Sequence, residues 1–86
     1  MSSHIICELI IIYKKAIFTN YDNRYYSIIT YIHNKFRLNK YNDNILIKDD
    51  YINEDELIKL MLEYDIAYIN NIEYQLNSGE INSFVG

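Results

Sequence analysis

Glycine and proline are nearly absent from this chain, and this constrains its turns more than any other feature. The 86 residues include two Gly and no Pro, so short polar side chains that hydrogen-bond their own backbone must form the turns. Asn and Asp cluster at residues 20–23, 39–44, 49–53 and 70–71, and residues 77–79 are a further short polar turn candidate. These clusters separate the segments that we expect to form helices and strands.

The first segment, residues 5–18, is compatible with either a strand or a helix. Its many β-branched residues favour a strand that is buried on both faces. Apolar side chains also recur at helical spacing in the same segment. That helical stripe would consist of Ile5, Leu9, Ile12, Tyr13 and Ala16. We predict the strand.

Residues 23–38 are predicted to form a helix, because apolar side chains recur there at helical spacing. The stripe consists of Tyr25, Ile28, Ile29, Ile32 and Phe36. Arg24, Lys35 and Arg37 fall largely outside this stripe, so the helix would present a basic outer face. A short strand, residues 44–48, is expected to follow between polar turns.

Residues 53–64 are predicted to form a second helix. Asn53 and Glu56 have the spacing of a capping box, and the acids of the first turn suit the positive end of the helix dipole. The buried stripe would consist of Leu57, Leu60, Met61 and Tyr64. Residues 66–76 are expected to form one or two strands hinged at residues 70–71, because Ile72, Tyr74 and Leu76 alternate with Glu73 and Gln75.

This order of elements predicts an α+β fold: a mixed sheet of three to five strands with two helices packed on one face. Residues 1–86 would form a single small globular domain, and residues 77–86 are polar enough to form a frayed tail. The order is compatible with a ubiquitin-like roll. If residues 5–18 are helical instead, the order becomes that of a winged helix.

Charge is divided unequally along the chain. Residues 1–48 carry seven Lys and Arg against three Asp and Glu, whereas residues 49–86 carry one basic residue against nine acids. A small protein with one basic and one acidic half can dock head to tail, or offer each half to a different partner.

The element order and the split of charge loosely resemble the PB1 modules, which assemble head to tail. The resemblance implies a basic contact on one copy and an acidic contact on the next. The acidic segment from Asp49 to Glu56 is shorter than the acidic loop of those modules.

No pattern in the sequence indicates catalysis, a metal site or a cofactor. Cys7 lies in an apolar run, where a thiol is more often buried and inert. His4 and Cys7 would supply two of the four ligands that a structural zinc site needs. The acids do not have the spacing of an EF-hand loop, and two glycines do not form a phosphate-binding loop.

The sequence also indicates where the protein resides. Cys7 is the only cysteine and no Asn-x-Ser/Thr glycosylation site is present, so an intracellular location is expected. The apolar run in residues 5–18 is interrupted by charges and is shorter than the roughly 20 residues that span a membrane. The abundance of Ile, Asn and Tyr is typical of AT-rich codons, which are common in viral and phage genomes.

We therefore expect a small, non-enzymatic, intracellular protein-interaction module that binds a partner protein or a second copy by electrostatic complementarity. The basic contact would comprise Lys35, Arg37 and Lys40, and the acidic contact Asp49, Asp50, Glu54, Asp55 and Glu56. The alternative is a winged-helix or platform-type nucleic-acid-binding protein that uses Arg24, Lys35 and Arg37. The first half of the chain interleaves six tyrosines with its basic residues, and single strands bind such surfaces.

Overall fold

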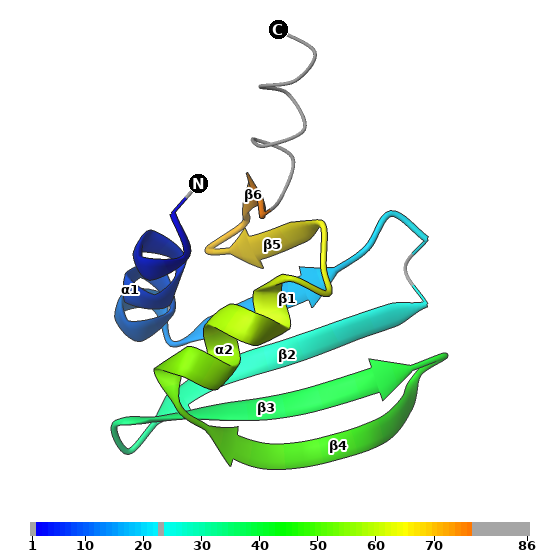
Figure 1. Ribbon diagram of the computed structural model, residues 1–86, viewed down its shortest axis with the longest axis horizontal. Helices are drawn as coiled ribbons and strands as arrows, with labels where there is room; N and C mark the ends of the chain where they lie inside the picture. Colours follow the sequence, from blue (N-terminus) through cyan, green and yellow to red (C-terminus); the bar gives the residue numbers. More distant parts are fainter. Residues whose placement is uncertain (1, 23, 77–86) are drawn as a thin grey trace, which may run out of the picture.

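The computed structural model describes residues 2–22 and 24–76, which form two helices and a sheet of six strands. In chain order the elements are α1 (Ser3–Tyr13), β1 (Lys15–Thr19), β2 (Tyr25–Ile32), β3 (Lys35–Asn42), β4 (Ile45–Ile52), α2 (Glu54–Met61), β5 (Ile66–Ile69) and β6 (Ile72–Gln75). The strands lie side by side in the order β4-β3-β2-β1-β5-β6 (Figure 1). The predicted α+β class is confirmed. The tail predicted for residues 77–86 lies outside the described residues.

The sheet differs from the predicted one in size and in strand direction. It has six strands instead of three to five, and every neighbouring pair is antiparallel, so the prediction of a mixed sheet is wrong. Tight two-residue turns join β2 to β3 and β3 to β4, so these strands alternate in direction. β1 also pairs antiparallel with β2. The connection through α2 then brings the chain from the edge strand β4 to β5, which pairs antiparallel with the central strand β1.

The helix predicted for residues 23–38 is also wrong, because this stretch forms most of the β2–β3 hairpin. Its turn is made by His33 (φ 53°) and Asn34 (φ 63°). Two successive residues with positive φ form a type I′ turn, whose twist matches that of the flanking strands. Asp43–Asn44 and Asn70–Asn71 repeat this pattern in the β3–β4 and β5–β6 turns. Since a hairpin replaces the second helix, the described residues do not have the winged-helix order.

Residues 5–18 contain both a helix and a strand. α1 ends at Tyr13, and Lys14 adopts the left-handed conformation (φ 72°), from which its N–H donates to the Ile10 carbonyl (2.7 Å). β1 begins at the next residue. The predicted strand is therefore wrong for the α1 part of the segment and correct for the β1 part.

The helical stripe considered for this segment is not the buried side of α1, although its Leu9 packs against the core and its Ala16 is buried on β1. Ile5 and Ile12 are 48% and 65% exposed, whereas Ile6, Cys7 and Ile10 are fully buried. Apolar side chains surround most of α1, so their spacing alone does not identify the side that is buried.

The second half of the chain agrees more closely with the prediction. α2 is capped by Asn53, whose Oδ1 accepts from the Glu56 N–H (2.8 Å) while Glu56 Oε1 accepts from the Asn53 N–H (3.1 Å). The hinged strand pair predicted for residues 66–76 is confirmed as β5 and β6. The short strand predicted for residues 44–48 is longer, since β4 continues to Ile52.

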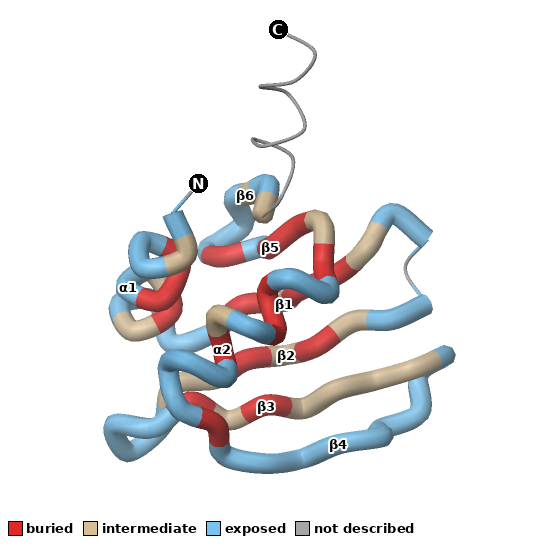
Figure 2. The backbone as a smooth tube through the Cα atoms, in the orientation of Figure 1, coloured by how far each residue is buried: buried red, intermediate tan, exposed pale blue. Residues whose placement is uncertain are grey.

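The core lies between the two helices and one face of the sheet, as the buried segments in Figure 2 show. α1 packs against α2 and against β1, β2 and β5. Phe18 on β1 and Tyr64 after α2 are the largest fully buried side chains, and their ring centroids are 6.0 Å apart. The predicted stripe of α2 is confirmed, because Leu57, Leu60 and Met61 are buried together with Tyr64.

Candidate interaction surface

The helices cover one face of the sheet, and we call the opposite face the open face. Neighbours along a strand point to opposite faces, so Ile17 points away from the helices because Ala16 and Phe18 point into the core. Directly paired residues share a face, and the register therefore identifies the rest. The main members of the open face are Lys15, Ile17, Tyr26, Ile28, Ile32, Lys35, Arg37, Tyr41, Leu46, Asp49, Tyr51 and Tyr68.

A continuous apolar row crosses the centre of the open face. Ile17 on β1 pairs with Ile28 on β2 and with Tyr68 on β5. Tyr68 is 40% exposed, and the two isoleucines are half-buried. At the α1 end of this row, Tyr13, Lys15, Ile17 and Tyr68 line a hollow of about 310 Å³. Asn70 and Asn71 complete the lining, so this hollow connects the row to the end of α1 through polar as well as apolar side chains.

A second row on the open face is aromatic. Tyr26 and Tyr41 are directly paired, and their rings stack at 4.8 Å with an interplanar angle of 12°. The Tyr26 hydroxyl donates to Asn44 Oδ1 (3.2 Å), and Leu46 on β4 extends the row. Because the tyrosine rings stack on each other, each has one flat side already in contact.

The predicted basic and acidic contacts meet on this face. Arg37 on β3 donates to both carboxylate oxygens of Asp49 on β4, from Nε at 2.9 Å and from Nη2 at 2.8 Å. The hydrogen bonds and the positive charge of Arg37 lower the pKa of Asp49, and Asp49 raises the pKa of Arg37 in turn. The basic and acidic halves of the sequence therefore meet in the fold, because β3 and β4 are neighbouring strands.

The other predicted cations lie in different environments. Lys35 is on the open face, with its Nζ 5.5 Å from the centre of the Tyr51 ring. Arg24 precedes β2, where its N–H donates to Asp22 Oδ1 (3.1 Å) and its carbonyl accepts from the Asp43 N–H (3.0 Å). The structure does not bring Arg24 to the same site as Lys35, because they lie at opposite ends of β2.

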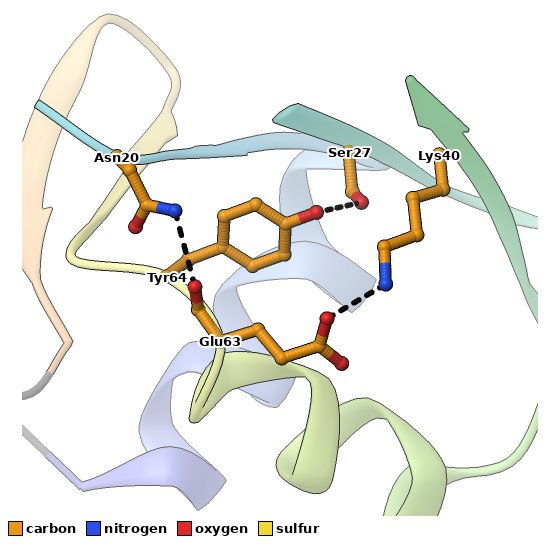
Figure 3. A network of polar contacts seen from close by, with 5 residues as sticks. All are labelled: Asn20, Ser27, Lys40, Glu63 and Tyr64. Atoms are coloured by element: carbon orange, nitrogen blue, oxygen red, sulfur yellow. Dashed lines mark hydrogen bonds and ion pairs between the residues drawn. The ribbon is translucent and has the colours of Figure 1, made fainter. Parts of the chain in front are cut away.

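Lys40 belongs to a polar network on the helix-covered side (Figure 3). Its Nζ lies 2.6 Å from Glu63 Oε1, and the Asn20 side-chain amide donates to the Glu63 carbonyl (3.2 Å). Beside them the hydroxyls of Ser27 and Tyr64 are 2.7 Å apart and buried. The hydrogen bond and charge of Glu63 raise the pKa of Lys40, against an opposing effect of burial. This network ties the end of α2 to β1, β2 and β3.

The predicted acids are divided between β4 and the start of α2. Asp50 neighbours Asp49 on β4 and therefore points to the helix-covered side. Glu54, Asp55 and Glu56 form the first turn of α2. Glu54 Oε1 lies 4.0 Å from His4 Nδ1 on α1. The nine predicted residues are thus spread over both faces of the sheet instead of forming two opposed patches.

Among the side chains considered for chemistry, His4 and Cys7 both lie near Glu54. Among the described residues no three His, Cys, Asp or Glu side chains form a group that could hold a metal ion. Cys7 is fully buried, and burial, with a smaller effect of the Glu54 charge, raises the pKa of its thiol to about 11. The thiol therefore stays protonated at neutral pH, and a protonated thiol is a poor nucleophile.

We expect Cys7 to react slowly with a disulfide reagent in the native protein. A pKa raised from 9.0 to about 11 lowers the thiolate fraction about 100-fold, and burial also blocks access. The rate of thiol release is measured in native buffer and again in concentrated guanidinium chloride, with Cys7→Ala as the blank. A native rate within about tenfold of the denatured rate would contradict this prediction.

The open face is not among the surfaces predicted from the sequence, although the sequence carries a signal for it. Read as strands, residues 25–32 place Tyr26, Ile28 and Ile32 on the side opposite the buried Ser27 and Ile29. Because both sides carry apolar residues, the alternation typical of a half-buried strand is weak. The prediction of a helix there then concealed which residues share a face.

Comparisons of the chain with protein-family models, with curated proteins and with solved structures found no match. Within the described residues, neither helix has the length and apolar character that crossing a membrane requires.

Proposed function

We propose that this domain is a non-enzymatic, intracellular protein-interaction module of viral or phage origin, and that its partner protein docks on the open face of the sheet. The observation that carries this proposal is the continuous apolar row of Tyr68, Ile17 and Ile28. The solvent side of an antiparallel sheet is normally polar, whereas apolar surface framed by polar residues is characteristic of binding sites.

Charges at the border of the apolar row indicate the chemistry of the partner. Lys15 and Lys35 lie on the open face, and no ion pair in the described chain involves either one. Arg37, on the same face, already forms an ion pair with Asp49. A partner surface with an apolar centre and acidic side chains around it would complement this arrangement.

Photo-crosslinking tests the proposal. A benzophenone amino acid replaces Ile28 on the open face or, as the matched control, Lys59 on the exposed side of α2. We expect position 28 to capture a specific protein that position 59 does not capture. The captured protein is then purified, and its affinity is measured for the wild type and for Ile28→Glu, Tyr68→Ala and Lys59→Glu.

The expected result is a loss of affinity of about tenfold or more for the two open-face variants, because each removes apolar contact at the centre of the interface. Lys59→Glu should bind as the wild type does. Circular dichroism confirms that each variant is folded. Binding that is unchanged in both open-face variants would contradict the proposal.

A platform-type nucleic-acid-binding function is the second proposal. It is supported by Tyr26, Tyr41 and Tyr51 on the same face as Lys35 and Arg37, since bases stack on aromatic side chains beside cations. Two features favour the protein partner instead: the tyrosine rings of the aromatic row stack on each other, and the chain has a net charge of −4. Binding of a mixed oligonucleotide pool that weakens steeply with salt would favour the nucleic-acid function.

A further inference from the structure

The outer edge of β4 is exposed along nearly its whole length. β4 is the last strand on its side of the sheet, and no described strand pairs with its outer edge. Of its eight residues, Ile52 is the one that is buried (Figure 2), while Ile45, Leu46 and Ile47 are 66%, 47% and 52% exposed. A long exposed edge strand with apolar side chains offers unpaired backbone groups to another strand.

Two opposite charges on β4 have no ion-pair partner in the described chain. Lys48 and Asp50 are both exposed, and neither belongs to the ion pairs of this part of the protein. They are two residues apart. Their cross-strand neighbours on β3 are Lys40 and Leu38, which lie on the helix-covered side. Lys48 and Asp50 therefore project from the same side of the edge strand.

We propose that two copies of this chain join through β4, antiparallel and centred on Asp49, so that Lys48 of each copy pairs with Asp50 of the other. A two-fold axis perpendicular to the sheet places residue 48 opposite residue 50 twice, because the interface is isologous. The two sheets become one continuous sheet.

The alternative registers are less favourable. A centre at Asp50 places Lys48 opposite Ile52 and pairs no charges. A centre at Lys48 places Ile47 opposite Asp49. Only a strand centred on Asp49 forms an ion pair in both directions, so the charge pattern selects one register.

The central contact brings two Asp49 residues together, which would be unfavourable for bare carboxylates. Each Asp49 carboxylate, however, accepts two hydrogen bonds from the Arg37 of its own chain. The guanidinium balances the negative charge at the centre of the interface. A β-bulge opposite Lys40 and Tyr41 interrupts the regular ladder beyond Lys48, and such bulges twist the edge away, so the pairing stays short and specific.

This dimer goes beyond the proposed function, because it uses the edge of the sheet and leaves the centre of the open face exposed. It is tested on the whole chain by sedimentation equilibrium or light scattering from about 1 to about 500 µM, a range that brackets the affinity of a small interface. We expect the mass to rise from monomer to dimer and to stop there, since the two-fold contact is closed.

Charge exchange tests the register. In Lys48→Asp, two acids lie opposite each other across the interface, and in Asp50→Lys two bases do. Each variant should therefore weaken the dimer about tenfold or more. The double variant K48D/D50K restores opposite charges and should dimerise as the wild type does. A mixture of the two single variants should form heterodimers, in which every pair is again complementary. Lys59→Asp is the matched control and should have no effect.

Three outcomes would overturn the proposal: a wild type that stays monomeric over the whole concentration range, a dimer that both single variants leave unchanged, or single variants that fail to recover when mixed or combined. A dimer formed through the exposed side of α1 would appear as the second of these outcomes. Partner binding to Ile28→Glu is measured separately, so failure of the dimer and failure of the proposed function are distinguishable.

Discussion

Phe18→Ala is expected to remove a large part of the stability of this domain. Phe18 is fully buried on β1, the strand that joins the two halves of the sheet. It pairs with Ser27 on one side and Ala67 on the other, and its ring contacts that of Tyr64. Deleting a buried phenylalanine ring costs about 3–5 kcal/mol. A chain of this length is stabilised by roughly 0.05–0.15 kcal/mol per residue, or about 4–13 kcal/mol in all, so the loss is a large fraction of the total.

Urea denaturation followed by circular dichroism measures this effect. The matched control is Ile12→Ala, because Ile12 is also a large apolar residue but is 65% exposed, and its loss should change the free energy of unfolding by less than about 0.5 kcal/mol. Phe18→Leu keeps most of the buried volume and should remain folded with a smaller loss. A loss below about 1 kcal/mol in Phe18→Ala would show that β1 does not organise the core as described here.

The parts of the fold that the sequence predicts are those with a local cause. The start of α2 depends on the capping box of Asn53 and Glu56, and both hydrogen bonds are present. The turn at Asn70–Asn71 depends on side chains that tolerate positive φ. Neither feature requires knowledge of what the segment packs against, so the sequence is sufficient for both.

The errors arise where apolar residues lie on both sides of an element. In β2 the core side carries Ile29 and the open face carries Ile28 and Ile32, so the segment satisfies a helical spacing as well as a strand. The deciding feature is the turn at His33 and Asn34. Histidine is not a typical residue for the first position of a type I′ turn, which is why the hairpin was not predicted.

The candidate surface could not be predicted because it depends on strand order. The charge split is a property of the sequence, but β3 and β4 are neighbours, and this pairing brings Arg37 onto Asp49. Lys40 and Glu63 likewise come from opposite charge halves and meet within one molecule. Both contacts join residues distant in sequence, and periodicity or composition carries no information on such pairs.

Tyr64→Phe is expected to lower the free energy of unfolding by about 1–3 kcal/mol, because it removes a hydroxyl whose partner, Ser27, is buried. Ser27→Ala breaks the same hydrogen bond from the other side and should also lower the free energy of unfolding. The double variant should cost less than the sum of the two, since both single variants remove the same hydrogen bond. Strictly additive losses in this double-mutant cycle would show that the two hydroxyls do not stabilise each other.

The pair also predicts how stability responds to alkali. Burial raises the pKa of Tyr64, and this effect outweighs the opposing effects of its hydrogen bond to Ser27 and of the Lys40 charge. An acid whose pKa is higher in the folded state loses its proton more easily on unfolding, so its contribution is complete below the ordinary tyrosine pKa near 10 and disappears as the pH rises above it. The wild type should therefore lose stability above about pH 10 more steeply than Tyr64→Phe. Parallel pH profiles would mean that ionisation of Tyr64 is not linked to unfolding, and that the helix-covered core admits the charged phenolate.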